Sequence, residues 1–370
     1  MKNVLMVGPV PPPYGGIAAV VQEIVDSELR NEYKFEVFDS QKDAPSELGL
    51  LKRLPFNIKR IFNFNKLITQ KKFDFAHLHF DRSSFRGKIF IILSLRLRGI
   101  KVLMHLHGTS WESFYEDVSK AQRFTAKLGL KYSNIILVLY NLWVRNIKEI
   151  LPDANVWVAA NFVNDESSFS HHLVDEYRKK CGFSQDDIVV TFVGGLGRRK
   201  GCFDILEAVP LVVSKRPQVK FLFVGGDDYS GEFDGIKNTV ESTDLSRNVF
   251  LTGEATREDV TVYLNMGQIF ILPSYLEGAP IAIIEAMRAS LPIITTPVGG
   301  IPDMIEHGVN GLLISPGKPE EIAESILRLV DDPFLRRSLG KTAHEIFRKR
   351  YSTSAAIREI ARIYKKLENM

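Results

Sequence analysis

The sequence predicts an α/β protein built from two Rossmann-like domains, each with a parallel sheet covered by helices. Short apolar runs alternate with helical patterns along the whole chain, as in proteins with parallel sheets. The alternation occurs as two successive series of strands, and a polar stretch at residues 161–172 separates them. A chain of 370 residues is also long enough for two domains of ordinary size.

The predicted strands are short apolar runs, and helical patterns fill most of the gaps between them. In the first series they are Asn3–Val7, Phe35–Phe38, Phe73–Leu78, Lys101–Leu106, Asn134–Leu139 and Val156–Ala160. In the second series they are Ile188–Val193, Val219–Val224, Asn248–Leu251, Gln268–Leu272, Pro292–Thr296 and Leu312–Ile314. Ligands of such sheets bind beyond the carboxyl ends of the strands, so we expect the active site in a cleft between the two domains.

Composition narrows the class of protein. A hydrophobic content of 45% and a charged content of 25% are typical of a soluble globular protein. Cys181 and Cys202 are too few for a disulfide scaffold, which favours a reducing cytosol. The longest apolar run is too short to span a bilayer, and the first residues have none of the features of a signal peptide.

Positive charge is concentrated in the first half of the chain. The net charge is +4, and no acidic residue occurs between Glu47 and Asp74. The cations of that window alternate with apolar residues and are Lys52, Arg53, Lys59, Arg60, Lys66, Lys71 and Lys72. A basic helix with an apolar face suits an anionic membrane surface, so we predict that segment 48–73 binds one. The alternative is a core-packing helix with a solvated face; no nucleic-acid motif accompanies the charge, and we expect no nucleic-acid partner.

The strongest chemical signal lies in residues 273–314. After a buried strand, a loop holds Glu277 and Gly278, and a helix is predicted to open at Pro280, which suits a first helical position. The N–H groups of a helix start beside glycines favour an anion such as phosphate. Glu277 and Glu285 flank that start and can accept hydrogen bonds from hydroxyl groups. Phosphate donors beside hydroxyl acceptors are typical of a sugar-nucleotide pocket.

Two further loops have the chemistry of phosphate sites. The strand Ile188–Val193 leads into the sequence GGLGRRKG, which ends in Arg198, Arg199, Lys200 and a glycine before a helix. Glycines beside three consecutive cations at a helix start suit a diphosphate. The first strand ends in a proline-rich loop that reaches a helix at Gly16, where the backbone can approach a ligand; a tight strand-to-helix turn is the alternative.

Four histidines close two predicted strands of the first series. His77 and His79 lie on one strand and His105 and His107 on the next, and alternate residues of a strand share a face. A metal site is therefore one interpretation. We do not favour it, because no cysteine and no tight carboxylate cluster joins the histidines. We expect structural roles for His77, His79 and His105.

The spacing of Glu277 and Glu285, followed by Gly299-Gly300-Ile301 and Gly308-x-x-Gly311, resembles the signature of the GT4 family of retaining glycosyltransferases. This resemblance implies the GT-B fold, in which two Rossmann-like domains face a central cleft. The implied domains are an acceptor-binding domain at 1–165, to which a last helix at about 354–370 crosses back, and a nucleotide-sugar-binding domain at 166–353.

The resemblance also implies roles for individual residues. Glu277, His107 and Lys200 receive catalytic roles, with His107 approaching the transferred sugar. Glu277 would hold hydroxyls of the donor sugar and Glu285 those of the ribose. The implied donor-binding residues are Gly16, Arg198, Arg199, Gly253, Gly278, Ala279, Pro280, Ile281 and Glu285. Gly195 stands where the family usually has a phosphate-binding arginine, which leaves open whether Arg198 or Arg199 supplies the second cation; we favour Arg199.

The function implied is transfer of a sugar, with retention, from a nucleotide-diphosphate sugar to a glycan or polyprenyl-linked acceptor in cell-surface polysaccharide synthesis. UDP is favoured over GDP as the carrier. Asp227-Asp228 lacks Asp-x-Asp spacing, so we expect no metal and no other cofactor. The expected location is cytoplasmic, peripheral to the inner face of the plasma membrane. Alternatives are a sugar-nucleotide epimerase of similar fold, a non-catalytic sugar-nucleotide binding protein, and a double displacement through Glu277.

Overall fold

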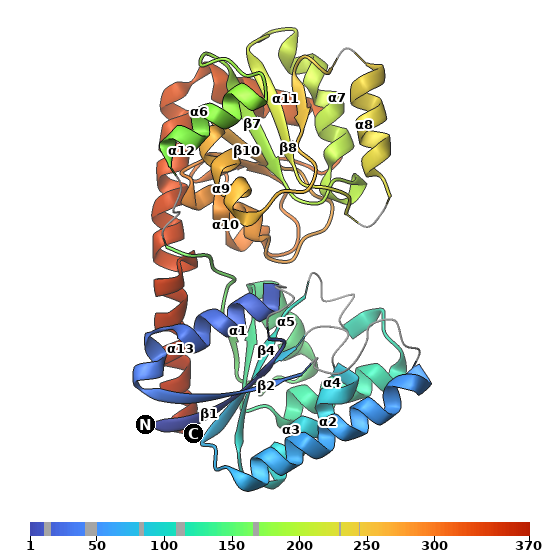
Figure 1. The fold of residues 1–370 in the computed structure, drawn as a ribbon, viewed down its shortest axis with the longest axis vertical. Helices are drawn as coiled ribbons and strands as arrows, with labels where there is room; N and C mark the ends of the chain where they lie inside the picture. The colour runs from blue at the N-terminus through green and yellow to red at the C-terminus, as the bar shows by residue number, and fades with distance from the viewer. Residues whose placement is uncertain are drawn as a thin grey trace. The chain divides into compact units, whose positions relative to one another are not determined.

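The chain forms two compact units. The computed structural model describes residues 1–10, 16–40, 50–80, 85–108, 115–165, 170–228, 231–243 and 245–370. One unit comprises Met1–Asn161 with Thr353–Met370, and the other comprises Phe162–Ser352 (Figure 1). Each unit contains a six-stranded sheet, and the strand pairings in both sheets are parallel. The predicted α/β fold class is confirmed.

The sheet of the first unit has the strand order β2-β1-β3-β4-β5-β6. Its strands are β1 (Lys2–Gly8), β2 (Tyr33–Asp39), β3 (Phe75–Phe80), β4 (Lys101–Leu106), β5 (Ile135–Val138) and β6 (Val156–Val158). Its helices are α1 (Gly16–Asp26), η1 (Glu28–Asn31), α2 (Leu50–Gln70), α3 (Phe85–Leu97), α4 (Lys120–Tyr132), α5 (Asn141–Ile150) and α13 (Thr353–Glu368). The order changes direction between β1 and β3, which makes the carboxyl ends of these strands a preferred place for a ligand.

The sheet of the second unit has the order β12-β11-β10-β7-β8-β9. Its strands are β7 (Ile188–Val193), β8 (Val219–Val224), β9 (Val249–Leu251), β10 (Ile269–Leu272), β11 (Ile293–Thr295) and β12 (Gly311–Leu313). Its helices are α6 (His171–Lys180), η3 (Arg198–Lys200), α7 (Cys202–Val213), α8 (Phe233–Ser242), α9 (Arg257–Met266), α10 (Ile281–Arg288), η4 (Ile301–Asp303), α11 (Pro319–Asp331), α12 (Pro333–Ile346) and η5 (Phe347–Tyr351). The direction changes between β7 and β10, as in a dinucleotide-binding sheet.

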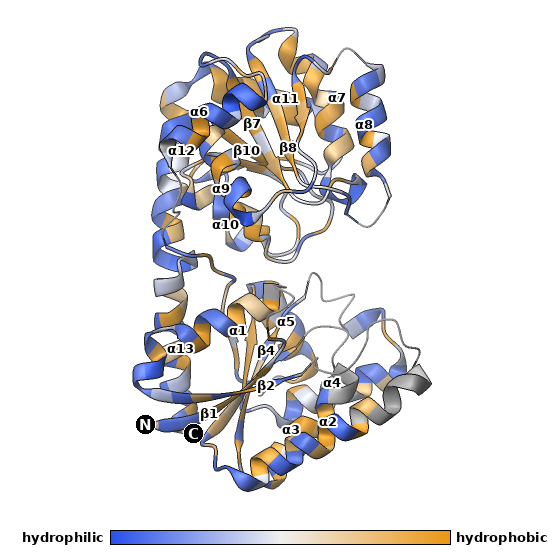
Figure 2. Ribbon diagram, viewed as in Figure 1, coloured by the Kyte–Doolittle hydropathy of each residue, from blue (hydrophilic) through white to orange (hydrophobic). Residues whose placement is uncertain are grey.

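Each predicted strand coincides with an observed one, because parallel strands covered on both faces read as nearly continuous apolar runs. The central strands are apolar, whereas the helices have a polar and an apolar face (Figure 2). All four residues of β10 are buried. In the second unit, α7 packs beside α8 and α11, and α9 packs beside α6 and α10.

Helix α13 belongs to the first unit although it follows the second in sequence. It buries Ile357, Ile360 and Tyr364 along one face. The Lys101 ammonium donates hydrogen bonds to the carbonyls of Leu367 and Glu368, at 3.1 and 2.9 Å, which satisfies the unpaired carbonyls at the helix end. This contact fixes the last turn of the chain against β4.

Helix α2 has one buried side and one exposed side. Phe64 and Ile68 are buried in the first unit, whereas Ile58 and Phe62 are 60% and 68% exposed. Among the residues that the structure describes, no helix is long and apolar enough to cross a bilayer. The apolar residues of α2 therefore include some that do not pack in the core.

Helix α10 ends in a Schellman turn that is closed by a serine. The N–H of Ser290 donates to the carbonyl of Met287 and the N–H of Leu291 to that of Ala286, both at 3.0 Å. The turn requires a left-handed residue, and Ser290 has φ +58°; no other non-glycine residue in the described ranges has a positive φ. Glycine is the residue that usually occupies such a position, and Ser290 carries the steric strain of a Cβ there.

We predict that Ser290→Gly stabilises the second unit by about 1 kcal/mol, because glycine adopts the left-handed conformation without the steric cost of a Cβ. The measurement is the urea-induced unfolding of the chain. Ser290→Ala is the matched control and should give no gain, since alanine keeps the Cβ. Equal stabilities of the glycine and alanine variants would contradict the strain argument.

Candidate active site

The candidate site of the second unit lies at the carboxyl ends of β7 and β10. These two strands are neighbours in the sheet although α7, β8, α8, β9 and α9 separate them in sequence. Their following loops hold the two strongest motifs of the sequence, the one ending in Lys200 and the one containing Glu277. Strand order thus brings the predicted diphosphate loop and the predicted sugar loop to one switch point.

Lys200 and Glu277 form an ion pair across this point. The Lys200 Nζ lies 2.5 Å from the Glu277 Oε1, and the side chains are 16% and 5% exposed. The Ser274 hydroxyl donates to the same carboxylate oxygen at 2.8 Å. Thr296 in turn donates to the Ser274 carbonyl at 2.5 Å. A buried carboxylate is stable only with such partners, so the pair and its hydrogen bonds act as a unit.

Two glycines make this approach possible. Gly201 has φ +74°, and a Cβ on it would lie 2.3 Å from the Pro273 carbonyl oxygen. Gly299 has φ +58°, and its Cβ would lie 1.8 Å from the carbonyl oxygen of Glu277. A side chain at Gly201 would push the Lys200 loop away from the loop that begins at Pro273, and one at Gly299 would push the loop after β11 away from the Glu277 carbonyl.

The two neighbouring arginines point to different partners. The Arg198 guanidinium lies over the Phe203 ring at 4.4 Å, and its Nε is 3.1 Å from Glu232. Arg199 instead lies along the Glu277 loop: its Nη1 donates to the Leu276 carbonyl at 3.4 Å, and its own carbonyl accepts from the Tyr275 N–H at 2.9 Å. Of the two candidates, Arg199 is therefore the one tied to the loop that holds the ion pair.

Gly195, which stands where the family has an arginine, packs against Asp228. A Cβ at Gly195 would lie 2.6 Å from the Asp228 Cβ. Asp228 has a side chain only 5% exposed, and its carboxylate is 3.9 Å from the Arg199 Nε. In this chain the aspartate occupies the space that a side chain at position 195 would need.

The start of α10 supplies backbone donors. Helix α10 begins at Ile281 with Pro280 as its N-cap, and no side chain of the described residues caps it. The prediction that the helix opens at Pro280 was thus one residue early, because Pro280 has ψ 120° and is extended. The Gly278 carbonyl accepts a hydrogen bond from the N–H of Gly300 at 2.7 Å, which fixes the loop before Ala279.

Glu285 lies one turn into α10 and is half-buried. Burial raises the pKa of its carboxyl group, and the nearby charges of Arg288 and Arg257 oppose that shift. Gly253, one of the predicted donor-binding residues, has φ +71°, and its carbonyl accepts from the N–H of Gly225 at 3.1 Å. Within the part of the chain that the structure describes, no hydrogen bond or ion pair joins Glu285 or Gly253 to Lys200 or Glu277. Their assignment to the site therefore rests on the sheet edge that they share with the pair.

In the first unit, His107 lies at the end of β4 and pairs with a second histidine. The His107 Nε2 is 2.9 Å from the Nδ1 of His79, at the end of β3. His77 bridges the Tyr364 hydroxyl at 2.9 Å and His105 at 3.3 Å. Burial lowers the pKa of all four histidines, so the cluster is neutral at pH 7.

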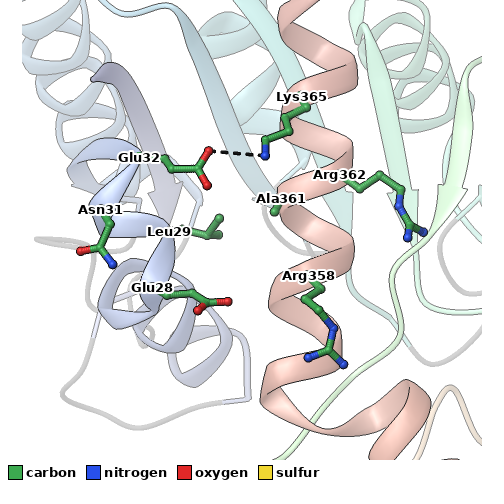
Figure 3. Close-up of a pocket in the computed structure, with 8 residues that line it drawn as sticks. All are labelled: Glu28, Leu29, Asn31, Glu32, Arg358, Ala361, Arg362 and Lys365. Carbon is green, nitrogen blue, oxygen red and sulfur yellow. Dashed lines mark ion pairs between the residues drawn. The ribbon is translucent and has the colours of Figure 1, made fainter.

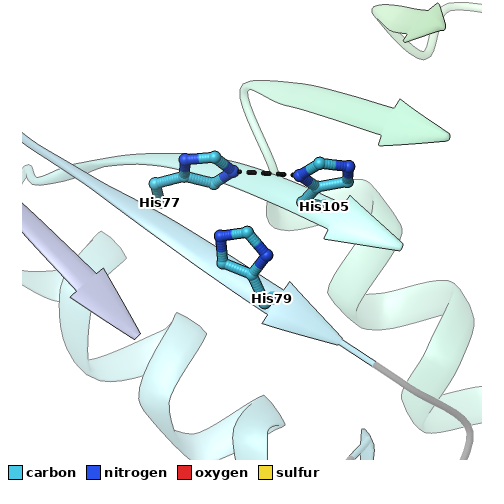
Figure 4. Close-up of side chains that lie close together, drawn as sticks. All are labelled: His77, His79 and His105. Carbon is cyan, nitrogen blue, oxygen red and sulfur yellow. Dashed lines mark hydrogen bonds between the residues drawn. The ribbon is translucent and has the colours of Figure 1, made fainter. Parts of the chain in front are cut away.

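His77, His79 and His105 could offer three nitrogens to a metal, since these lie within 4.8 Å of one another (Figure 4). Other features disfavour a cation. Both ring nitrogens of His77 already have partners, and the buried Lys88 ammonium donates to the His79 carbonyl at 2.5 Å. No carboxylate or thiolate of the described residues joins the three. The Nε2 atoms of His79 and His105 are buried without a hydrogen-bond partner among the described residues, so the histidines form a neutral network that is only partly satisfied.

Gly16 is the first residue of α1, and the proline-rich loop before it, residues 11–15, lies outside the described residues. Sequence reasoning missed Ser274, Asp228 and the partner role of His79. Ser274 had a usable signal, a hydroxyl three residues before Glu277. Asp228 had none, because its contact with Gly195 joins the loops after β7 and β8.

Known proteins similar to this chain are glycosyltransferases. Residues 174–346 match the family described as glycosyl transferases group 1. The N-acetyl-alpha-D-glucosaminyl L-malate synthase of Bacillus anthracis is 23% identical over 313 residues, which cover 84% of this chain and 79% of that protein. The UDP-Gal:alpha-D-GlcNAc-diphosphoundecaprenol alpha-1,3-galactosyltransferase of Escherichia coli is 26% identical over 286 residues, 75% of this chain and 72% of that protein.

Among solved structures, Anabaena HepE in complex with UDP and glucose is similar over 99% of this chain and 100% of that chain. The TM-score is 0.75 and the identity 18%, so this likeness concerns the fold. The family match lies in the unit that holds the Lys200–Glu277 pair. The match to the glycosyl transferases group 1 covers residues 174–346, and together with the GT-B fold and these relatives it identifies the chain as a glycosyltransferase enzyme.

Proposed function

We propose that this enzyme is a retaining, metal-independent glycosyltransferase that uses a nucleotide-diphosphate sugar, with UDP as the favoured carrier. Its proposed acceptor is a glycan or lipid-linked glycan of a cell-surface polysaccharide. The observation that carries the proposal is the 2.5 Å contact of Lys200 and Glu277 at the β7–β10 switch point. It joins a cation suited to a diphosphate with a carboxylate suited to sugar hydroxyls.

Cleavage of the sugar–phosphate bond places negative charge on the departing diphosphate. Groups that are already aimed at that charge lower the barrier most. Lys200, Arg199 and the backbone N–H groups at the start of α10 are the candidates in this unit. Glu277 holds the Lys200 ammonium in place before the donor arrives. Because these groups supply positive charge, a metal ion is not needed for the same task, which supports metal independence.

Glu277 is better suited to positioning than to nucleophilic attack. Its Oε1 already accepts from Lys200 and Ser274, which withdraws charge from the carboxylate. It can still accept a hydrogen bond from a donor-sugar hydroxyl, and Glu285 can do so from the ribose. In the proposed mechanism the acceptor hydroxyl attacks from the face that the diphosphate leaves, and the diphosphate takes its proton. Double displacement through Glu277 is the competing mechanism.

The relatives support the proposed donor and acceptor. The Escherichia coli relative is named for a UDP-sugar donor and a diphosphoundecaprenol-linked acceptor. The similar Anabaena structure contains UDP and glucose. These are properties of those proteins, and for this chain they make UDP-sugars and polyprenyl-linked glycans the first compounds to test.

The proposed location is cytoplasmic, at the inner face of the plasma membrane, with α2 as the contact. On α2, Lys59 and Lys66 are exposed, as are Ile58 and Phe62. Cations beside exposed apolar side chains suit an anionic lipid surface. Arg60 is partly buried, and its Nη1 donates to the Ser40 carbonyl at 2.7 Å, so we test Lys59 and Lys66 first.

We predict that Lys200→Met lowers the free energy of unfolding by about 3 kcal/mol, because it leaves the Glu277 carboxylate buried without its cation. Urea denaturation measures this. The double variant Lys200→Met/Glu277→Met should recover most of the loss. Arg216→Met, which breaks the exposed 2.7 Å pair with Asp331, is the matched control and should cost less than about 1 kcal/mol. Equal losses in the two single variants would contradict a buried pair.

We predict that Lys200→Ala and Glu277→Ala each lower kcat at least about 100-fold, because both groups act on the charge and position of the reacting sugar. UDP- and GDP-sugars are incubated with polyprenyl-diphosphate glycans, and mass spectrometry identifies the products. Thermal stabilisation of the wild-type enzyme by UDP and by GDP identifies the base.

The matched control for transfer is Arg216→Ala, which should keep wild-type activity. Full activity in both site variants would overturn the proposed function. Conversion of UDP-GlcNAc without any acceptor would favour an epimerase, and tight UDP binding without turnover of any donor would favour a binding protein.

We predict that Lys59→Glu/Lys66→Glu lowers binding to phosphatidylglycerol vesicles at least about tenfold, since each lysine near an anionic surface contributes about 1 kcal/mol. Cosedimentation measures the bound fraction, with phosphatidylcholine vesicles as the neutral reference. The matched control reverses Lys215 and Lys341, exposed lysines of the second unit. If both double variants bind like the wild type, α2 is not the membrane contact.

A further inference from the structure

Helices α2, α3 and α4 form one layer of the first unit. The chain crosses the sheet in the same direction from β2 to β3, from β3 to β4 and from β4 to β5, so right-handed connections place all three helices on one face. Helix α3 packs beside both α2 and α4 (Figure 1). Arg98, which follows α3, donates to the Thr69 hydroxyl of α2 at 3.2 Å. The outer sides of the three helices therefore make one surface, which we call the α2–α4 face.

The α2–α4 face is basic because its helices contain no acidic residue. Lysine and arginine occur five times in α2, three times in α3 and four times in α4, and aspartate and glutamate occur in none of them. Acidic residues make up 44 of the 370 residues of the chain, so their absence from three neighbouring helices is a property of this face. Cations that gather without acidic neighbours favour an anionic partner.

Exposed phenylalanines lie between the lysines of α2 and α4. Phe62 is 68% exposed and stands three residues after one exposed lysine and four before another. Phe124 is 66% exposed and stands four residues after one exposed lysine and three before another. The lysines are Lys59 and Lys66 on α2 and Lys120 and Lys127 on α4. Residues three or four apart share a side of a helix, so each ring lies between two lysine side chains.

Helix α3, which lies between α2 and α4, presents apolar side chains instead. Phe90 is 54% exposed and Leu97 is 85% exposed, and a separation of seven residues places them on one side of the helix. Lys88 is buried, and the Arg96 guanidinium donates to the Asn134 side chain at 2.8 Å. The α2–α4 face thus has an apolar centre with a lysine-flanked phenylalanine on either side.

Helix α13 covers the opposite face of the same sheet. His77 and Phe80 are three residues apart on β3, so their side chains point to opposite faces. The Tyr364 hydroxyl of α13 lies 2.9 Å from the Nδ1 of His77, whereas the Lys88 ammonium of α3 lies 5.0 Å from the centroid of the Phe80 ring. The surface of α13 is therefore a natural reference for the α2–α4 face.

The cations of α13 face carboxylates of their own unit. A pocket of about 440 Å³ lies between η1 and α13 (Figure 3). Glu28 and Glu32 line one wall of it, and Arg358, Arg362 and Lys365 line the other. The Lys365 ammonium lies 3.6 Å from the Glu32 carboxylate. Positive charge on this face is thus balanced by nearby carboxylates, whereas the helices of the α2–α4 face have none.

We infer that the α2–α4 face binds the surface of an anionic lipid bilayer, with α3 and α4 taking part beside the α2 contact. The exposed rings and Leu97 enter the boundary between headgroups and acyl chains, and the lysines on either side reach the lipid phosphates. A soluble polyanion would use the lysines but would leave Phe90 and Leu97 in water. That the bilayer carries the acceptor rests on the proposed function; the binding itself does not.

The test is cosedimentation of the full chain with phosphatidylglycerol vesicles, with phosphatidylcholine vesicles as the neutral reference. We expect Lys120→Glu/Lys127→Glu on α4 to lower binding at least about tenfold, because two attractive charges become repulsive. Phe90→Ala/Phe124→Ala should also lower it at least about tenfold, because two rings no longer enter the bilayer. Heparin binding, which reports charge alone, should fall in the lysine variant and stay unchanged in the phenylalanine variant.

The matched controls lie outside the α2–α4 face. Arg358→Glu/Arg362→Glu reverses two exposed cations of α13, and Phe334→Ala removes a ring of the second unit that is 79% exposed. Both should bind vesicles within about twofold of the wild type, because charges far from the lipid are screened. The thermal midpoints of the α3 and α4 variants should be unchanged, since each replaced side chain is exposed. If one midpoint falls, the single variant Lys127→Glu or Phe124→Ala replaces that double variant.

Wild-type binding in both α3 and α4 double variants would overturn the inference, and a loss confined to Lys59→Glu/Lys66→Glu would leave α2 as the contact. Loss in the lysine variant with wild-type vesicle binding in the phenylalanine variant would also overturn it and make the face a polyanion site. A wild-type chain that does not bind phosphatidylglycerol vesicles would overturn the inference together with the proposed location.

The inference and the proposed function fail separately. The vesicle assay contains no donor and no acceptor, so its outcome does not depend on sugar transfer. Vesicle binding that depends on the lysines and phenylalanines, without transfer to any acceptor, would overturn only the proposed function. Transfer to a water-soluble acceptor by a chain that does not bind the vesicles would overturn only the bilayer contact.

Discussion

The ion pair of Lys200 and Glu277 is the interaction on which the site of this glycosyltransferase depends. It joins the loops after β7 and β10 by a 2.5 Å contact that is largely hidden from solvent. The left-handed Gly201 lets these two loops approach closely enough to form it, and the left-handed Gly299 lets the loop after β11 pack against the Glu277 carbonyl. Removing one charge would leave the other buried and unpaired, which would destabilise the two loops. The same ion pair therefore stabilises the loops and positions both side chains.

The two units meet their ligands with different chemistry. The second unit concentrates charge at its switch point, with Lys200, Arg199 and the backbone donors of α10. The first unit places four buried imidazoles at the ends of β3 and β4, and burial keeps them neutral. His107 can therefore donate or accept a hydrogen bond without adding charge, which suits a residue expected near a neutral sugar. The proposed diphosphate site requires positive charge instead, and the cations of the second unit can supply it.

Departures from the family pattern have physical explanations in the structure. Asp228 fills the space that a side chain at Gly195 would need. Ser290 is held at φ +58°, a position that favours glycine, by the turn that closes α10. The first feature is consistent with the proposal that Arg199 supplies the second cation, and the second adds strain. A departure from the family sequence pattern can therefore be interpreted only when the contacts of that residue are known.

The sequence by itself determined the strands, the α/β class and the positions of the main motifs, because apolar runs and glycine-rich loops are local signals. Tertiary structure alone decided which motifs meet. Strand order places Glu277 beside Lys200 and His79 beside His107, and it directs Arg198 to Glu232 and Arg199 to the Glu277 loop. These contacts join residues far apart in the chain, and their geometry depends on the packing of whole strands and helices, which no local pattern encodes.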